Sequence, residues 1–312
     1  MVAAEVSGLL VVDKPVGPTS FEVVARVRRL FRAAKAGHTG TLDPLASGVL
    51  AVCLGECVKL QGWLAEGDKA YQATVAFGAA TATEDAEGEV VARGDPEALT
   101  HEALLAALPR FLGEIEQVPP MYSAVRVGGR RLHEAARAGE EVVRAPRRVR
   151  VDALELVALD PPADGLARAL LRVRCGKGTY VRTLAADLGR ALGVPAHLAG
   201  LRRTAAGPFT LADAVALAEA ERLAAVDRAA LRARVLPMDE ALRGWPVLRL
   251  SPEEARALGH GRTLLRREGD DGPRRALGPS GDLVAVCEQR GGVVRPLRVL
   301  RGASVDGSPR IP

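Results

Sequence analysis

One carboxylate stands apart in a segment that is rich in glycine. Residues 36–48 read Ala-Gly-His-Thr-Gly-Thr-Leu-Asp-Pro-Leu-Ala-Ser-Gly, so we expect a loop rather than a helix or a strand. No other acidic residue lies within ten positions of Asp43 on either side. Pro44 restricts the backbone before it, and the flanking glycines let a planar ligand approach closely. The segment can therefore present one carboxylate as a nucleophile, although an Asp-Pro turn with a capping carboxylate fits the same residues.

The tyrosines are the second feature with chemical potential. The chain has three, Tyr71, Tyr122 and Tyr180, and each lies beside a basic or Gly/Pro-rich segment. Enzymes that act on a base taken out of a nucleic acid helix stack that base on aromatic side chains. Tyrosine also fills half-buried strand positions in many proteins, so none of the three decides the matter by itself. Together with the isolated loop carboxylate, they favour an enzyme that acts on nucleic acid.

A short segment, Gly176-Lys177-Gly178-Thr179, opens a helical pattern with leucines at positions 184, 188 and 192. Backbone amides at the start of a helix bind phosphate groups, so this segment is a candidate phosphate site. It is not a P-loop, because the first glycine of that pattern is missing.

Basic residues gather in one region of the chain. Residues 126–150 hold eight arginines and three glutamates, an excess of five positive charges that equals the net charge of +5 of the whole chain. We expect an arm, at about residues 121–150, that grips an anionic partner. A solvated helical hairpin explains the same residues equally well.

The composition is that of a globular protein, with 48% hydrophobic and 26% charged residues. The N-terminal residues have no basic region of a secretory signal, and no apolar run is long enough to span a membrane, so we expect a cytoplasmic protein. The four cysteines lack the paired spacing of a zinc site, so we expect buried free thiols and no bound metal. They are Cys53, Cys57, Cys175 and Cys287.

Apolar periodicity indicates the elements that would position these residues. Punctuation by proline and glycine near residue 244 indicates a boundary before a small, mostly β domain, with strands at 247–250, 283–288 and 293–300 and a helix at 252–258. Before that boundary we expect strands at 8–12, 49–54, 69–77, 113–118, 149–159, 169–175 and 198–203, helices at 21–31, 101–109 and 211–235, and an exposed acidic loop at 79–94.

Several segments together resemble the motifs of one family, in that family's order. This is the TruB family of bacterial pseudouridine synthases, which act on uridine 55 in the T loop of transfer RNA. The resemblance spans residues 8 to about 205, and the C-terminal segment is similar in size and pattern to the PUA domain that ends these enzymes. The matching segments are 8–15 (Gly-Leu-Leu-Val-Val-Asp-Lys-Pro), 37–44 (Gly-His-Thr-Gly-Thr-Leu-Asp-Pro), 69–71 (Lys-Ala-Tyr), 120–124 (Pro-Met-Tyr-Ser-Ala), 177–182 (Lys-Gly-Thr-Tyr-Val-Arg) and 201–204 (Leu-Arg-Arg-Thr).

The resemblance implies catalytic roles for three residues. Asp43 matches the nucleophile, Tyr71 the tyrosine that stacks on the flipped uracil, and Arg182 the arginine that pairs with the aspartate. Whether Asp43 attacks C6 of the ring or C1′ of the sugar stays open. Burial raises the pKa of a carboxyl group and a neighbouring arginine lowers it, and we expect the arginine to prevail at Asp43.

The resemblance also implies residues that bind the substrate. His38, Tyr180 and Leu201 match positions that contact the target nucleotide or its neighbours. Lys14 is placed with them, although its motif is mainly structural in the family. The basic arm matches a mobile segment that closes over the RNA, and Arg130 and Arg147 are its candidate phosphate contacts.

The fold implied by the resemblance is α+β. Residues 1–243 would form a pseudouridine synthase catalytic domain with a largely antiparallel mixed sheet, and residues 244–312 a small β-barrel-like PUA domain that binds RNA. The reaction imports no group, so no cofactor is expected. The partner would be the T stem-loop of tRNA, with no membrane and no obligate protein partner, and the chain would be a monomer. Two other readings stay open, a non-catalytic RNA-binding protein or tRNA-folding chaperone, and a guide-RNA-dependent synthase of the dyskerin type.

Overall fold

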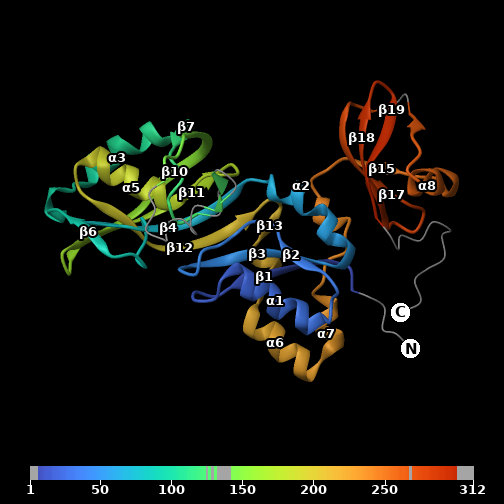
Figure 1. Ribbon diagram of the computed structural model, residues 1–312, viewed down its shortest axis with the longest axis horizontal. Helices are drawn as coiled ribbons and strands as arrows, with labels where there is room; N and C mark the ends of the chain where they lie inside the picture. The colour runs from blue at the N-terminus through green and yellow to red at the C-terminus, as the bar shows by residue number, and fades with distance from the viewer. Residues whose placement is uncertain (1–5, 124–125, 128–129, 132–141, 267–268, 301–312) are drawn as a thin grey trace.

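The computed structural model describes residues 6–123, 126–127, 130–131, 142–266 and 269–300. A ten-stranded sheet runs through the long axis of the molecule, and a second sheet of five strands lies at one end (Figure 1). Helices cover one face of the large sheet along its length, and short helices cover the other face near β1 and β3. This is the α+β architecture with a largely antiparallel mixed sheet that the family resemblance implies.

The large sheet has the order β14-β1-β3-β12-β4-β11-β10-β7, with β13 beside β12 and β2 beside β3. All pairs are antiparallel except β1 with β14 and β3 with β12. The parallel pairing of β12 with β3 brings Leu201 opposite Ala46, at the end of the glycine-rich segment. The bounds are β1 (Gly8–Lys14), β2 (Ala36–His38), β3 (Ala46–Leu54), β4 (Lys69–Phe77), β7 (Gly113–Gln117), β10 (Arg147–Ala163), β11 (Leu166–Cys175), β12 (Ala196–Ala206), β13 (Phe209–Thr210) and β14 (Val215–Ala216).

Strands β1 and β3 read as apolar runs because both faces of the sheet are covered there. On one face Leu10 and Leu50 join the core formed by α1 (Ser20–Phe31) and α6 (Leu217–Val226). On the other face Leu9 and Val49 belong to a second core that continues into the C-terminal sheet. Helix α5 (Val181–Leu192) packs on β12 near α3 (His101–Ala107), which covers the far end of the sheet (Figure 1).

Helix α1 starts where its sequence provides a cap. Thr19 accepts a hydrogen bond from the backbone of Glu22, whose carboxylate accepts one from the backbone of Thr19 in return. Such a capping box satisfies two backbone donors that the first helical turn leaves open. Val23, Val27 and Phe31 then bury one face of the helix.

The expected helix at 211–235 is wrong in its extent. Residues 217–226 form α6, and α7 (Arg228–Ala233) follows as a separate helix. The break falls at Asp227, whose side chain accepts a hydrogen bond from the backbone of Ala230 and so starts a new helix. An aspartate competes for backbone amides in this way, and the apolar periodicity does not reveal it.

The expected exposed loop at 79–94 is also wrong. It contains β5 (Ala79–Thr81) and β6 (Val90–Arg93), and between them Asp85 is only 3% exposed. The backbone of this stretch binds β12, because Leu198 donates to Glu84 and Ala86 donates to Leu198. The acidic composition indicates residues exposed to solvent, but Asp85 is buried against a cationic side chain, as described below.

The predicted loop around Asp43 is shorter than expected. Residues 36–38 form β2, which pairs with β3, and β3 begins at Ala46. Only residues 39–45 remain irregular. The segment therefore leaves the sheet and returns to it within a few residues.

The C-terminal sheet has the order β15-β17-β18-β19-β16 and curls into a half-barrel, consistent with a PUA-like domain. Helix α8 (Pro252–Gly259) covers it, capped by Ser251. Strand β17 was not predicted, because its first residues, Gly-Pro-Arg-Arg, are not typical of a strand. The bounds are β15 (Val247–Arg249), β16 (Leu264–Leu265), β17 (Gly272–Leu277), β18 (Leu283–Arg290) and β19 (Val293–Val299).

The two sheets share a core at their junction. Leu283 and Val286 of the C-terminal sheet belong to the same apolar cluster as Leu9 and Val49. Trp63 of α2 (Gln61–Ala65) meets Trp245 edge to face, with 6.3 Å between the ring centroids. The two sheets pack against each other, and the division of the chain into two domains at residue 244 remains a prediction.

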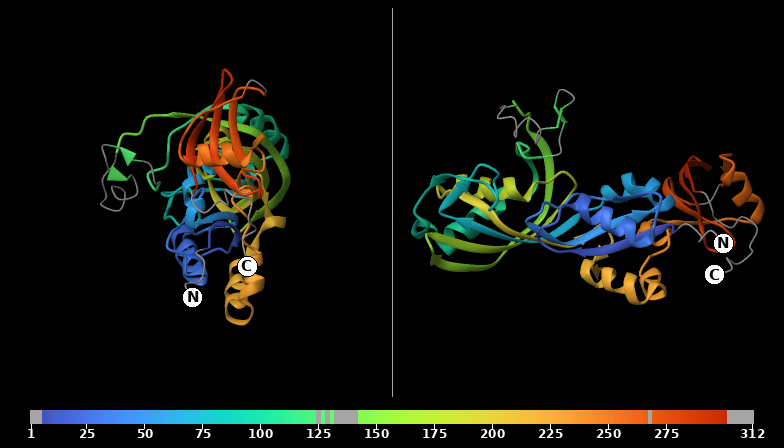
Figure 2. Two further views of the ribbon diagram at one scale, coloured as in Figure 1. Left: turned by 90° about the vertical axis from the view of Figure 1, so that its right-hand side faces the viewer. Right: turned by 60° about the horizontal axis from the view of Figure 1, so that its bottom comes forward.

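The basic segment leaves the body between β7 and β10. Its described parts include β8 (Arg126–Val127) paired with β9 (Arg130–Arg131), and they stand out from the molecule in Figure 2. Residues 132–141 of the expected arm lie outside the described residues. No helix in the described part of the chain is both long and apolar enough to cross a membrane.

Candidate active site

Three buried side chains hold the Asp43 loop in place. The Ser20 hydroxyl donates to the carbonyl of Leu42 at 2.8 Å and accepts from its amide at 2.7 Å. Lys14, which is fully buried, donates to the carbonyls of Ala46 at 2.7 Å and Pro15 at 2.9 Å. These bonds fix the backbone on both sides of Asp43.

Arg203 holds the same loop from β12. It is 2% exposed, and its guanidinium donates to the carbonyls of Val49 at 2.7 Å, Gly40 at 3.0 Å and Thr41 at 3.3 Å. Lys14 and Arg203 both donate hydrogen bonds to backbone carbonyls. Burial also lowers the pKa of Lys14 to about 8. This arrangement favours a structural role for Lys14 over contact with RNA.

The structure brings Arg182 to Asp43. The Nε atom of Arg182 lies 3.1 Å from Oδ2 of Asp43, and its Nη1 atom lies 3.4 Å from Oδ2 of Asp85. The side chains of Arg182 and Asp85 are 7% and 4% exposed, whereas that of Asp43 keeps 37%. The same guanidinium donates to the carbonyls of Tyr122 at 2.9 Å and Thr83 at 3.2 Å. One buried cation thus orients two carboxylates, and only Asp43 faces the solvent.

The pKa of Asp43 does not follow the expectation. It lies above the ordinary value, because burial in the site disfavours the anion more than Arg182 favours it. Asp85 adds a second negative charge that pushes in the same direction as burial, while Lys14 and Arg203 oppose it. The prediction that the arginine prevails is therefore wrong for the free protein, since Arg182 divides its charge between two carboxylates.

Tyr71 lies beside this pair on β4. It is 8% exposed, and burial raises the pKa of its hydroxyl, which keeps the phenol protonated near neutral pH. Strand pairing sets Tyr71 opposite Arg203 on β12, and the charge of Arg203 opposes the rise in the pKa of the Tyr71 hydroxyl. Arg203 thereby links the aromatic ring to the loop that carries Asp43.

A cleft of about 890 Å³ opens above these groups. Its volume falls in the range of pockets that bind small molecules. Asp43, Tyr71 and Arg182 line it together, as does the buried Asp85. The other predicted residues that line it are His38, Tyr180 and Leu201, and Thr19, Ser20, Phe21, Tyr122 and Thr179 also contribute.

The predicted substrate residues differ in how they are held. His38 is half-buried, its Nδ1 atom has no hydrogen-bond partner among the described residues, and burial lowers its pKa. Tyr180 precedes α5, and buried Gln117 binds both its amide at 3.0 Å and its carbonyl at 3.2 Å. Arg147 is exposed at the start of β10, opposite Gln117 in the strand pairing. Arg130 begins β9, and its side chain lies outside what the structure describes.

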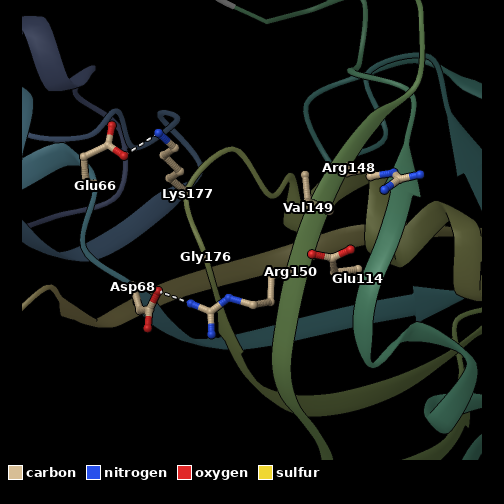
Figure 3. A pocket seen from close by; sticks show the side chains of 8 residues that line it. All are labelled: Glu66, Asp68, Glu114, Arg148, Val149, Arg150, Gly176 and Lys177. Carbon is tan, nitrogen blue, oxygen red and sulfur yellow. Dashed lines mark hydrogen bonds and ion pairs between the residues drawn. The ribbon is translucent and has the colours of Figure 1, made fainter.

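The candidate phosphate site at 176–179 is occupied by contacts within the protein. Lys177 pairs with Glu66, and Arg150 binds Asp68 at 2.7 Å, on the two sides of a hollow of about 270 Å³ (Figure 3). Three acidic and three basic side chains line this hollow, so their formal charges cancel. The geometry therefore does not favour a phosphate site there.

Sequence reasoning missed Asp85, Ser20, Gln117 and the role of Arg203. Arg203 was within the segment 201–204 that resembled a family motif, which was the available signal. No such signal marks Asp85, because it lies in a polar stretch whose composition indicates exposure to solvent. The four cysteines are buried, as predicted, and no three His, Cys, Asp or Glu residues in the described part of the chain gather as a metal site.

Comparisons with known proteins agree with the sequence resemblance. The family model for the N-terminal domain of TruB family pseudouridylate synthases matches residues 28–181. A model for the C-terminal domain of tRNA pseudouridylate synthase B matches 182–243, and one for the C-terminal part of tRNA pseudouridine synthase II matches 245–301.

Relatives match over nearly the whole chain. A tRNA pseudouridine synthase B from Stutzerimonas stutzeri is 46% identical over 303 residues, which cover 96% of this chain and 97% of that protein. One from Cupriavidus metallidurans is 45% identical over 311 residues, 95% of each chain. Among solved structures, an H/ACA RNP bound to a substrate RNA containing 2′-deoxyuridine contains a chain with a TM-score of 0.72 and 26% identity, covering 97% of this chain and 87% of the other. The chain belongs to the TruB family of pseudouridylate synthases.

Proposed function

We propose that this chain is a tRNA pseudouridine synthase that isomerises uridine 55 of the T loop, with Asp43 as the nucleophile. The observation that carries the proposal is the carboxylate of Asp43, held 3.1 Å from Arg182 at the cleft and beside Tyr71. Membership of the family supports the reaction class. The relatives are tRNA pseudouridine synthases B, which supports tRNA as the substrate.

The reaction breaks the bond between N1 of uracil and C1′ of ribose, turns the base, and joins C5 to C1′. C5 loses a proton, and N1, which carries none in uridine, gains one in the product. No electron or group is gained, so the protein has to bind the nucleotide, form a transient covalent bond and move a proton. A carboxylate nucleophile, a base platform and a group that can carry a proton suffice for these steps.

Asp43 attacks either C6 of the ring or C1′ of the sugar while it is ionised. Its ester with the substrate carries no charge, so Arg182 loses one of its partners at that stage. Asp85 and the carbonyls of Thr83 and Tyr122 still bind the guanidinium, which keeps the buried cation satisfied. In our proposal this is the role of the second, buried carboxylate, Asp85, at the cleft.

The remaining residues of the cleft hold the nucleotide. Taking a base out of its stack costs a few kcal/mol, which stacking on an aromatic ring offsets in part. Tyr71 provides that ring in our proposal, and its hydroxyl relays the proton that leaves C5 by accepting it while passing its own proton on. His38, Tyr180 and Leu201 contact the uridine or its neighbours. Arg130, Arg147 and the C-terminal sheet bind RNA further out, and the chain acts as a monomer without a protein partner.

The test is to incubate the purified chain with an unmodified tRNA transcript and map pseudouridine at single-nucleotide resolution. Asp43→Asn removes the nucleophile, and Asp160→Asn, an exposed carboxylate of β10, is the matched control. We expect one pseudouridine at position 55 with the wild type and with Asp160→Asn, and none with Asp43→Asn. Modification by Asp43→Asn at the wild-type rate would reject the nucleophile.

A product at another uridine would reject the position but not the reaction. Tight tRNA binding without any product would favour a folding chaperone. Product that forms only when a guide RNA is added would favour the mechanism of ribonucleoprotein synthases, to which one of the similar solved structures belongs.

A further inference from the structure

Phe21 is an aromatic side chain to which the proposed function assigns no role. It is 78% exposed and lines the same cleft as Asp43. Only 3% of the chain is aromatic, with five phenylalanines in all. The apolar face of α1 is made by Val23, Val27 and Phe31, so Phe21 is not needed for packing of the helix. Binding clefts are lined mainly by apolar and aromatic side chains, so Phe21 is placed to contact what the cleft binds.

The backbone that carries Phe21 is tied to the catalytic loop. Thr19 and Glu22 form the capping box around it, and Ser20 makes two hydrogen bonds to Leu42, the residue before Asp43. Phe21 therefore keeps a fixed position relative to Asp43 without any closing motion. A rigid aromatic group loses little conformational freedom when it binds.

The neighbouring charge limits the kind of group that can meet this ring. The carboxylate of Glu22 is exposed, and its hydrogen bonds to Thr19 lower its pKa, so it is ionised at neutral pH. An RNA phosphate would be repelled there. The uncharged face of a nucleobase fits, and stacking of a base on an aromatic side chain is a common source of affinity for single-stranded RNA.

We propose that Phe21 stacks on a nucleobase of the T loop next to the flipped uridine. The inference rests on the proposed function and names a further substrate-binding residue for it. The uracil lies against Tyr71 deeper in the cleft, and the adjacent base lies on Phe21 at the entrance. Phe21 thus holds the loop open after the base has left the stack.

The test compares Phe21→Ala, Phe21→Trp and Phe21→Leu on a T stem-loop transcript. Leucine keeps an apolar side chain of similar size but has no ring face, and tryptophan keeps a face. Val226→Ala, at the exposed end of α6 and 67% exposed, is the matched control. Stacking adds a factor of about 5 to 150 to affinity, so we expect KM to rise within that range for Phe21→Ala and Phe21→Leu. Phe21→Trp and Val226→Ala should match the wild type.

A second readout detects the stacking itself. Two transcripts carry 2-aminopurine, one on each side of the target uridine, and their fluorescence falls when the base stacks on a ring. In proteins that carry Asp43→Asn, we expect the fluorescence of one transcript to be quenched with the native Phe21 and with Phe21→Trp. The quenching should be lost with Phe21→Ala. An unchanged KM and unchanged quenching in Phe21→Ala, or full recovery by Phe21→Leu, would overturn the inference. Absence of product with the wild type would instead overturn the proposed function.

Discussion

Arg182 illustrates how one buried cation can serve two carboxylates with different tasks. Asp85 is buried and compensates the guanidinium permanently, whereas Asp43 keeps a face toward the cleft. Burial, together with the negative charge of Asp85, leaves the pKa of Asp43 raised in spite of Arg182. In the proposed reaction this carboxylate is held in an environment that costs energy before it attacks.

The raised pKa of Asp43 leads to a prediction about stability. A carboxyl group whose pKa is higher in the folded state contributes stability at pH values below its unfolded pKa. That contribution is lost as the pH rises through the folded pKa. The ionised group therefore destabilises the fold at pH 7, so Asp43→Asn should remove catalysis without lowering the free energy of unfolding. Urea denaturation at pH 7 measures this, and a clear loss of stability would show that the anion stabilises the fold.

Arg182→Met should shift the pH dependence of the reaction. Removing the guanidinium removes the largest influence that lowers the pKa of Asp43, so the acidic limb of kcat against pH should move to higher pH. Stability should fall by about 3–5 kcal/mol, because Asp85 is left buried without a cation. Arg190→Met is the control, an exposed arginine on the same helix that pairs with Asp187. An unmoved acidic limb would separate Arg182 from the ionisation of Asp43.

At the scale of elements, the junction of β3 and β12 depends on one glycine. Gly48 has a φ of +103°, and a Cβ atom there would lie 2.1 Å from the carbonyl oxygen of Arg203. Gly48→Ala should therefore push apart the two strands that carry the loop and Arg203. We expect a loss of several kcal/mol in the free energy of unfolding and a lower kcat.

Gly62→Ala is the matched control for that substitution. A Cβ atom at Gly62, within helix α2, meets no atom within 4 Å. Alanine there should leave stability unchanged or raise it by about 0.5–1 kcal/mol. Equal thermal midpoints for the two variants would show that the close approach at Gly48 can relax.

The sequence predicted elements well where one physical rule acted. Strand β4 at 69–77 and the core of β11 follow from alternation, and α1 follows from its apolar face. The predictions were wrong where a residue or strand far away in the chain determines the local structure. Asp85 is buried only because Arg182, far along the chain, compensates it, and β17 pairs as a strand only because β15 and β18 flank it. Residue patterns carry no such information about long-range pairing.

The candidate site was predicted in part for the same reason. The family motifs indicated Asp43, Tyr71 and Arg182, and the structure brings them to one cleft. The supports of the loop were not predicted, because Ser20, Gln117 and Arg203 act through backbone groups of other elements. Their residue types give no sign of the carbonyl or amide that each will bind.

At the scale of the molecule, the charged segment between β7 and β10 should govern the response of RNA binding to salt. Each phosphate contact that is lost should reduce the slope of log K against log salt by about 0.7–0.9. We expect the double substitution Arg130→Ala with Arg147→Ala to weaken tRNA binding and flatten this slope. Arg222→Ala, an exposed arginine on α6 that pairs with Glu219, should leave it unchanged. A wild-type slope in the double variant would count against a segment that grips RNA.

The contact of Trp63 with Trp245 has a practical consequence for spectroscopy. These are the two tryptophans of the chain, and both lie where the large sheet meets the C-terminal sheet. Neither tryptophan lines the cleft, so intrinsic emission reports on this junction between the sheets. A change in emission when RNA is added would show that binding alters the surroundings of these two side chains, which makes the native chain its own optical sensor of the junction.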